Sequence, residues 1–152
     1  MTLDQFDIAI LSALQKDGTM TNAALSEAAN LSPSQCSRRR SALEEAGLII
    51  GYSARLNARK LGFGLRAITR VNLLGHGQGK DDAFARFVAA QPEIRSAFSV
   101  SGDADYVLDI VVQDLDAYAD FLHQKLLPHP QVAQVRSEMI LKTLKDDGGV
   151  AL

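Results

Sequence analysis

Cysteine is almost absent from this sequence of 152 residues, and long apolar runs are missing. Cys36 is the only cysteine, so the chain cannot form a disulfide within itself, which fits the reducing cytoplasm. No run of about 18 apolar residues occurs, so we expect no membrane-spanning helix. The opening residues, MTLDQFDIAI, lack the basic segment and the apolar stretch of a secretory signal. These absences together predict a cytoplasmic protein.

The signatures of the common enzyme classes are missing as well. The sequence has no phosphate-binding glycine loop, no Gly-x-Ser-x-Gly motif and no thiol paired with a suitable histidine. Asp103, Asp105 and Asp109 suggest metal-assisted hydrolysis as an alternative, but catalytic metals usually recruit histidine too. The three histidines show no ligand spacing. We therefore expect no enzyme, no catalytic residues, no metal site and no cofactor.

Charge is distributed unevenly along the chain. The net charge is only −2, with 47% apolar and 22% charged residues, a balance typical of a globular protein. Residues 34–60 carry six basic side chains and two acidic ones, whereas residues 102–120 carry six aspartates and no lysine or arginine. This segregation indicates two functional halves, of which only the first attracts phosphate.

The first thirty residues predict two short helices. Asp4 is suited to cap the first helix, which ends at Gly18, and Thr21 is suited to cap the second. Asn30-Leu31 then forms a tight turn. The expected apolar faces are Ile8, Leu11 and Leu14 in the first helix and Ala24, Leu25 and Ala28 in the second.

A third helix has the sharpest start signal in the chain. Ser32 and Gln35 are spaced as a capping box, and Pro33 occupies the first helical position, where its fixed φ is favourable. The helix is expected to run to Ala46 and to stop at Gly47, where a left-handed residue costs little. Residues 48–52, Leu-Ile-Ile-Gly-Tyr, then predict a short strand or a wing.

The second half changes to the two-residue period of strands. The expected order is βαββαβ, the ferredoxin-like split βαβ, with Asp81 and Asp114 capping its two helices. The expected strands span 65–74, 94–100, 106–112 and 132–144, and a flexible glycine-rich loop occupies 75–79. The predicted fold class is α+β, with a three-helix winged helix-turn-helix domain at 1–52, a linker at 53–64 and a ferredoxin-like βαββαβ domain at 65–152.

Three short helices with a tight turn before the third describe a helix-turn-helix, whose last helix enters the major groove of DNA. At about 100° per residue, Cys36 and Leu43 form the buried seam of that helix, and Arg39 lies toward them. Small hydroxyls on the opposite side permit close approach to base edges, and arginine grips guanine or phosphate. The predicted DNA-binding residues are Ser34, Gln35, Ser37, Arg38, Arg39 and Ser41.

An alternative interpretation of the arginine triplet 38–40 is that these side chains are exposed to solvent and have no specific role in DNA binding. The helix-turn-helix context and the capping box argue against it for Arg38. Arg39 is a separate case, because its place near the seam allows it to pair with Glu44 or with a phosphate and to read no base.

Several segments of the chain match one known family in the right order. They are Leu-Asp at 3–4, Leu-Gln-Lys-Asp-Gly at 14–18, Leu-Ser-Pro-Ser at 31–34, Gly-Leu-Ile-Ile-Gly-Tyr at 47–52 and Gly-Asp-Ala-Asp-Tyr at 102–106. With these segments the sequence resembles the Lrp/AsnC, or feast/famine, transcription regulators over nearly its whole length.

The resemblance implies a RAM- or ACT-like βαββαβ domain that dimerises, with further assembly into tetramers or octamers, and an amino acid bound between subunits. The Gly-Asp-x-Asp-Tyr turn is where the ligand is expected, at Gly102, Asp103, Asp105 and Tyr106. Asp103 or Asp105 can accept from the ammonium of a zwitterion, and turn N–H groups near Gly102 can donate to its carboxylate. The last strand, around Glu138, is implied to contribute.

A structural interpretation of the same turn stays open. Gly102 permits positive φ, Asp103 and Asp105 are residues that hydrogen-bond their own backbone in turns, and Tyr106 can be a strand residue at a dimer seam. Two positions depart from the family. Ala104 replaces a bulky residue and suggests a roomier pocket, and Arg40 replaces an apolar residue and suggests an added phosphate contact.

The function predicted from the sequence is a sequence-specific DNA-binding transcription regulator that responds to a small effector, an amino acid. Its expected partners are double-stranded DNA, that effector and further copies of the chain. Two alternatives remain: an effector-independent architectural DNA-binding protein, and a stand-alone ligand-binding module whose helix-turn-helix has decayed.

Overall fold

The computed structural model describes residues 2–75, 77–145 and 149–152, and the chain divides into two compact units. The first unit comprises Met1–Arg55 together with Lys145–Leu152, and the second comprises Leu56–Leu144. The linker expected at 53–64 stays a prediction.

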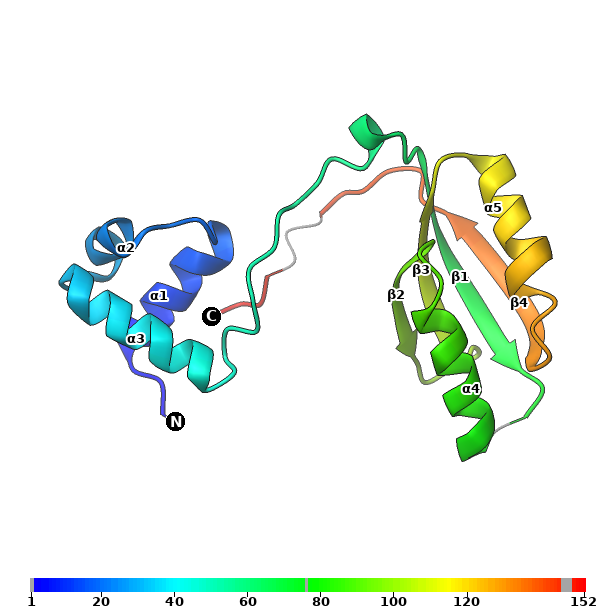
Figure 1. The fold of residues 1–152 in the computed structure, drawn as a ribbon, viewed down its shortest axis with the longest axis horizontal. Helices are drawn as coiled ribbons and strands as arrows, with labels where there is room; N and C mark the ends of the chain where they lie inside the picture. Colours follow the sequence, from blue (N-terminus) through cyan, green and yellow to red (C-terminus); the bar gives the residue numbers. More distant parts are fainter. Residues whose placement is uncertain (1, 76, 146–148) are drawn as a thin grey trace. The chain divides into compact units, whose positions relative to one another are not determined.

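Each helix of the first unit begins where a side chain satisfies its free N–H groups, as the sequence predicted. The caps are Asp4, Thr21 and Ser32, and Asp4 and Ser32 each form a reciprocal capping box. Asn30 closes the second helix in the left-handed conformation, with φ 53°. The helices are α1 (Gln5–Lys16), α2 (Asn22–Ala29) and α3 (Pro33–Glu45), shown in Figure 1.

The core of this unit is a small apolar cluster between the three helices. It contains Ile10, Leu14, Leu25, Ala29, Cys36 and Leu43. The seam predicted for α3 is confirmed, since Cys36 and Leu43 are fully buried. The apolar face predicted for α1 is shifted, because Asp7, Ile10 and Leu14 face inward while Ile8 and Leu11 are only partly buried.

The segment after α3 forms no strand within the described chain, so of the two alternatives expected here, a short strand or a wing, the strand is wrong. The N–H groups of Leu48 and Ile49 both donate to the carbonyl oxygen of Leu43 and close the helix end around Gly47. A strand needs a second strand for its backbone groups, and none of the described segments provides one here. The residues that follow are extended and exposed, with Ile50 98% accessible to solvent.

The second unit is a four-stranded antiparallel sheet in the order β2-β3-β1-β4, as the ferredoxin-like prediction required. Among the described residues, two helices cover one face of the sheet and no helix covers the other (Figure 1). The elements are β1 (Leu65–Leu73), α4 (Gln78–Ala89), β2 (Ile94–Ser99), β3 (Tyr106–Val112), α5 (Leu115–Phe121) with a π-helical extension η2 (Leu122–Leu126), and β4 (Val132–Met139). A 3-10 turn, η1 (Arg59–Leu61), precedes them.

Alternation along β1 and β3 separates the two faces of the sheet. The helix-covered face carries the core, which is made of Ala67, Val71, Leu73, Phe84, Leu108, Ile110, Val112, Tyr118, Phe121 and Leu126. A polar contact lies in this core: the buried hydroxyls of Tyr118 and Thr69 bond one another at 2.7 Å, and the Tyr118 hydroxyl donates to Ser137 Oγ at 2.5 Å. These bonds join α5 to β1 and β4 on the helix-covered face of the sheet.

Two element boundaries in this unit differ from the prediction by more than one residue. Helix α4 begins at Gln78 after Gly77, not after Asp81, so the last two residues of the expected 75–79 loop are helical, and His76 lies outside the described residues. Strand β4 ends at Met139, because its partner β1 begins at Leu65 and the last ladder bond runs from the N–H of Ile140 to Arg66. None of the helices in the described ranges has the length and apolarity that crossing a membrane requires.

Replacing Tyr118 by phenylalanine tests the buried hydroxyl contact. The variant leaves the Thr69 and Ser137 hydroxyls without their shared partner, so we expect the free energy of unfolding to fall by about 1–3 kcal/mol. Urea unfolding followed by circular dichroism measures it. Tyr106→Phe is the matched control, because the Tyr106 hydroxyl makes only a 3.4 Å hydrogen bond to Asp81. Equal stability of the Tyr118 variant and the native chain would contradict this role.

Candidate functional site

The exposed side of α3 brings together five of the six residues predicted to bind DNA. They are Ser34, Gln35, Ser37, Arg38 and Ser41, all exposed and opposite the buried Cys36 and Leu43. Arg38 has no hydrogen-bond or ion-pair partner among the residues that the structure describes. It borders a shallow hollow of about 290 Å³ beside Asp7, Arg39 and Ala42. The face therefore offers small hydroxyls around one uncommitted guanidinium.

Arg39, the sixth predicted residue, points back into its own unit. Its Nη1 lies 2.7 Å from Asp7 Oδ1 and its Nη2 lies 2.9 Å from Asp4 Oδ2. The guanidinium also lies over the Phe6 ring, 5.4 Å from the centroid. Glu44, which the sequence offered as its partner, bonds Arg40 and Tyr52 instead. Arg39 therefore ties the third helix to the first turn of α1.

The carboxylates that hold Arg39 also hold the start of α1. The hydrogen bond from the Asp7 N–H, aided by the Arg39 guanidinium, lowers the pKa of Asp4 below its ordinary value of 3.8. The side-chain bonds to Asp7 and then Asp4 raise the pKa of Arg39. The two carboxylates thus accept hydrogen bonds both from the free N–H groups at the start of α1 and from the Arg39 guanidinium.

Arg40 is held within the unit as well. Its Nε donates to Glu44 Oε1 at 3.2 Å and to the Tyr52 hydroxyl at 2.9 Å, and its Nη1 donates to the Met20 carbonyl at 3.2 Å. The guanidinium lies over the Tyr52 ring, 4.6 Å from the centroid. These bonds use Nε and one N–H of Nη1 and hold Arg40 within the unit, and the phosphate contact expected for this position stays a prediction.

Two hydrogen bonds that involve side chains fasten the turn between β2 and β3 to β1. Gly102 adopts φ 125°, a conformation that glycine reaches without strain. Asn72 Nδ2 donates to the Asp103 carbonyl oxygen at 2.8 Å, and the Leu73 N–H donates to Asp105 Oδ2 at 2.8 Å. The second bond falls at the irregularity of register between Asn72 and Leu73. Asp105 thus supports the backbone of β1.

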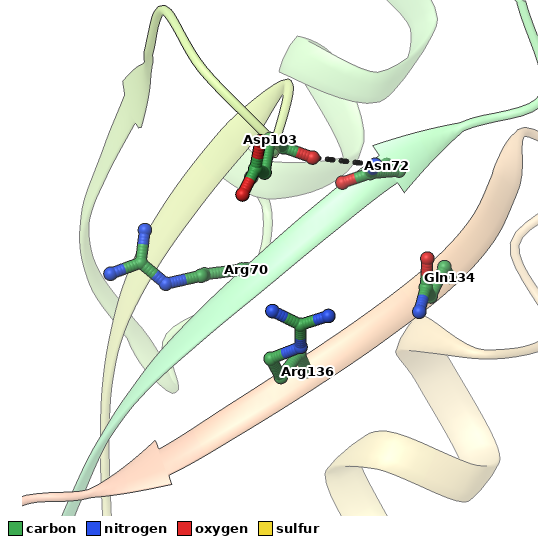
Figure 2. Close-up of a pocket in the computed structure, with 6 residues that line it drawn as sticks. Arg70, Asn72, Asp103, Gln134 and Arg136 are labelled. Atoms are coloured by element: carbon green, nitrogen blue, oxygen red, sulfur yellow. Dashed lines mark hydrogen bonds between the residues drawn. The ribbon is translucent and has the colours of Figure 1, made fainter.

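A small pocket opens beside this turn on the sheet face that carries no helix. Figure 2 shows Arg70 and Arg136 on neighbouring strands, with Asp103 at the turn above them. The volume is about 30 Å³, which holds one or two water molecules. The lining residues are Arg70, Asn72, Asp103, Ala104, Gln134 and Arg136. A ligand the size of an amino acid needs further walls than one chain provides.

The structure separates the predicted effector residues. Asp103 lies at the pocket, whereas Tyr106 lies on the helix-covered face, where its ring contacts Phe84 at a centroid distance of 4.9 Å. Burial and the nearby Asp81 carboxylate raise the pKa of the Tyr106 hydroxyl. Glu138 lies near the pocket through a 3.4 Å contact with Arg70. Effector contacts by Gly102, Asp105 and Tyr106 stay predictions.

Sequence reasoning did not select the pocket residues contributed by β1 and β4. They face one another across the ladder, where Arg70 opposes Arg136 and Asn72 opposes Gln134. The available signal is polar residues at alternate positions of an apolar strand, which in β1 are Arg66, Arg70 and Asn72. Guanidinium groups bind carboxylates in a two-bond fork, and Asp103 can accept from an ammonium group. The pocket can therefore bind both charged ends of a zwitterion.

Sequence families match both units. The family described as winged helix-turn-helix DNA-binding matches residues 3–50, and the Lrp/AsnC ligand binding domain matches residues 66–150. The leucine-responsive regulatory protein of Rhizobium meliloti is 40% identical over 144 residues, covering 95% of this chain and 92% of that protein. Transcriptional regulator AzlB of Bacillus subtilis is 32% identical, covering 94% of this chain and 91% of that protein.

Solved structures share the fold. A transcriptional regulator of Neisseria meningitidis, solved as its L-Met complex, superposes with a TM-score of 0.92 at 39% identity, covering 95% of this chain and 94% of that one. AsnC of E. coli has a TM-score of 0.86 at 19% identity, with 96% and 97% of the two chains covered, and supports the fold alone.

Asp7→Asn tests the ion-pair cluster that positions α3. The variant removes the charge that Arg39 faces at 2.7 Å. We expect the free energy of unfolding to fall by about 1–3 kcal/mol in urea titrations. Glu45→Gln is the control, since Glu45 is exposed and has no hydrogen-bond or ion-pair partner in the described chain. A stability loss no larger than that of the control would exclude this role for the pair.

Acid should weaken the same cluster. Because the folded pKa of Asp4 is lowered below 3.8, ionised Asp4 stabilises the fold fully above that value, and the contribution is lost as pH falls through the folded pKa. Asparagine keeps a capping oxygen but not the charge. Thermal melts from pH 6 to pH 2.5 should show native and Asp4→Asn proteins differing most above about pH 5 and converging below about pH 4. A pH-independent difference would count against the ionic contribution.

Proposed function

Since the chain belongs to the Lrp/AsnC family of transcription regulators, we propose that it binds specific DNA sequences through α3 and that an amino acid bound in the second unit changes its DNA affinity. The observation that carries this proposal is the exposed Arg38 among small hydroxyls on α3. The pocket beside Asp103 supports the second part.

Some side chains of α3 contact DNA, and others hold the helix in position. Ser34, Ser37 and Ser41 let the helix approach base edges, and Arg38 donates to a guanine or a phosphate. The Gln35 carbonyl accepts from the Ser32 N–H at 2.9 Å, which leaves its amide N–H groups for a base. Arg39 positions the helix through Asp4 and Asp7 and reads no base.

The effector is an amino acid held between charges of opposite sign. The Neisseria relative was solved with L-Met, and this chain has the groups that an amino acid backbone requires. Asp103 accepts from the ammonium, and an arginine of the pocket donates to the carboxylate. Ala104 is 94% buried and lines the pocket, and the extra room expected from its small side chain is part of this proposal.

A second copy of the chain completes the pocket. The uncovered sheet face carries half-buried apolar residues, Ile68, Val107 and Val111, beside the exposed Phe98. Packing two such faces together covers them and adds walls to a pocket of about 30 Å³. The resulting dimer presents two α3 helices to half-sites roughly one DNA turn apart, so a near-palindromic target is expected. Tetramers or octamers extend this dimer.

The same proposal places the chain in the cytoplasm, with DNA, and gives it no catalytic role. Its support is that the matched relatives are transcription regulators.

Fluorescence anisotropy tests both halves of this function. The probe is DNA from upstream of the protein's own gene, titrated at two salt concentrations with and without a panel of amino acids. We expect binding that weakens with salt and that at least one amino acid shifts by roughly 5- to 150-fold. Binding that no amino acid shifts would favour an effector-independent architectural protein. No binding to upstream DNA would contradict the proposal.

Arg38→Ala localises the DNA contact. Loss of one arginine contact should weaken DNA binding roughly 5- to 150-fold, with the urea unfolding midpoint unchanged because Arg38 has no partner among the described residues. Arg86→Ala, an exposed arginine on α4, is the control for lost charge. Unchanged DNA affinity of the Arg38 variant would refute its assignment to the DNA face.

A further inference from the structure

Two arginines face one another across the strands that line the pocket. Arg70 of β1 and Arg136 of β4 are direct partners in the antiparallel register. Their side chains rise on the same side of the sheet as Asp103 (Figure 2). Like charges directly opposite one another destabilise a sheet, so this arrangement costs free energy unless an anion lies between them.

The carboxylates on this face do not balance the pair. Glu138 contacts Arg70 at 3.4 Å, with both side chains about half exposed. Arg136 has no hydrogen-bond or ion-pair partner in the part of the chain that the structure describes. Farther along the same face, by contrast, Asp109 holds Arg66 through two bonds of 2.7 and 2.9 Å and also meets Arg95 at 3.2 Å. The pocket therefore keeps an uncompensated guanidinium.

The lining of the pocket disfavours an apolar ligand side chain. Five of the six lining residues are charged or amide residues, and the sixth, Ala104, offers one methyl group. A leucine or methionine side chain placed here would remove water from guanidinium and amide groups without returning hydrogen bonds. The Asn72 amide is already committed in part, since it donates to the Asp103 carbonyl, whereas the Gln134 amide lies at the rim.

We propose that the pocket selects an acidic amino acid, one with a second carboxylate on its side chain. Asp103 accepts from the ammonium group, and the two guanidiniums each receive one carboxylate in the planar fork that arginine forms. This ligand neutralises both members of the Arg70–Arg136 pair, which an amino acid with a neutral side chain cannot do. The inference rests on the proposed function, because it names the class of effector for the same site.

Calorimetric titration of the full-length protein tests the ligand class. The probes are L-glutamate, L-aspartate, L-glutamine, L-leucine and L-methionine, each at the same salt concentration. We expect glutamate or aspartate to bind roughly 10- to 100-fold more tightly than glutamine, which has nearly the same shape as glutamate without the charge. Tighter binding of leucine or methionine than of both acids would overturn the proposal.

The Arg136→Gln variant tests whether Arg136 is responsible for the preference for an acidic ligand. The variant should lose roughly 10- to 100-fold in affinity for the acidic ligand and keep its affinity for glutamine within about 2-fold. Arg136→Lys, which keeps the charge but not the fork, should fall between. Arg86→Gln removes the same charge from exposed α4 and should bind as the native protein does. Circular dichroism checks that each variant is folded.

These experiments distinguish a wrong class of ligand from a wrong regulatory function. If leucine or methionine binds best and shifts DNA affinity, the regulator stands and the acidic class is wrong. If Arg136→Gln binds the acidic ligand as tightly as the native protein, the arginine pair is not its site. If no amino acid binds while DNA does, the acidic class and the effector half of the function both fail.

Discussion

Arg39 lies between the first and third helices with its two terminal nitrogens on the carboxylates of Asp7 and Asp4. This contact acts together with the burial of Cys36 and Leu43, which seats α3 in the apolar core of the first unit. Asp4 and Asp7 cap α1 and also meet the guanidinium, so one cluster sets both where the first helix starts and where the third lies. The exposed face of α3 is then fixed by helical geometry.

A carboxylate of the same unit holds some of the arginines discussed above and is missing beside others. Arg39, Arg40 and Arg66 are partly buried, and each donates to carboxylates of its own unit. Arg38 and Arg136 have no such partner among the described residues, and each lies on a surface suited to an anion. We propose that this anion is DNA for Arg38 and a carboxylate of the effector for Arg136. Regulation then requires that the effector bind with different affinity to DNA-competent and DNA-incompetent states.

Local signals in the sequence predicted most of the fold. Capping is local chemistry, so Asp4, Thr21, Ser32 and Asp114 marked four helix starts correctly. The start of α4 was misplaced because its cap, Gly77, contributes no side-chain hydrogen bond, whereas Asp81 resembles a cap and lies within the helix. The strand order followed from the βαββαβ sequence, since short connections leave few alternatives.

The site was predicted less completely, because it depends on contacts between distant parts of the chain. The partners of Arg39 could not be assigned from its own helix, where Glu44 was the nearest carboxylate. The Arg70–Arg136 pair appears only once β1 and β4 are in register. The turn motif identified the right region. Because successive side chains of a strand point to opposite faces of the sheet, Tyr106 lies on the helix-covered face, whereas Asp103 lies at the pocket.

We propose that ligand binding at the arginine pair and DNA binding by α3 are energetically coupled. The most direct measurement is the dissociation constant of L-glutamate by calorimetry, with the free protein and with its saturated DNA complex. Linkage requires the two constants to differ by the same factor by which glutamate changes the DNA affinity, roughly 5- to 150-fold. Identical constants with and without DNA would contradict the account.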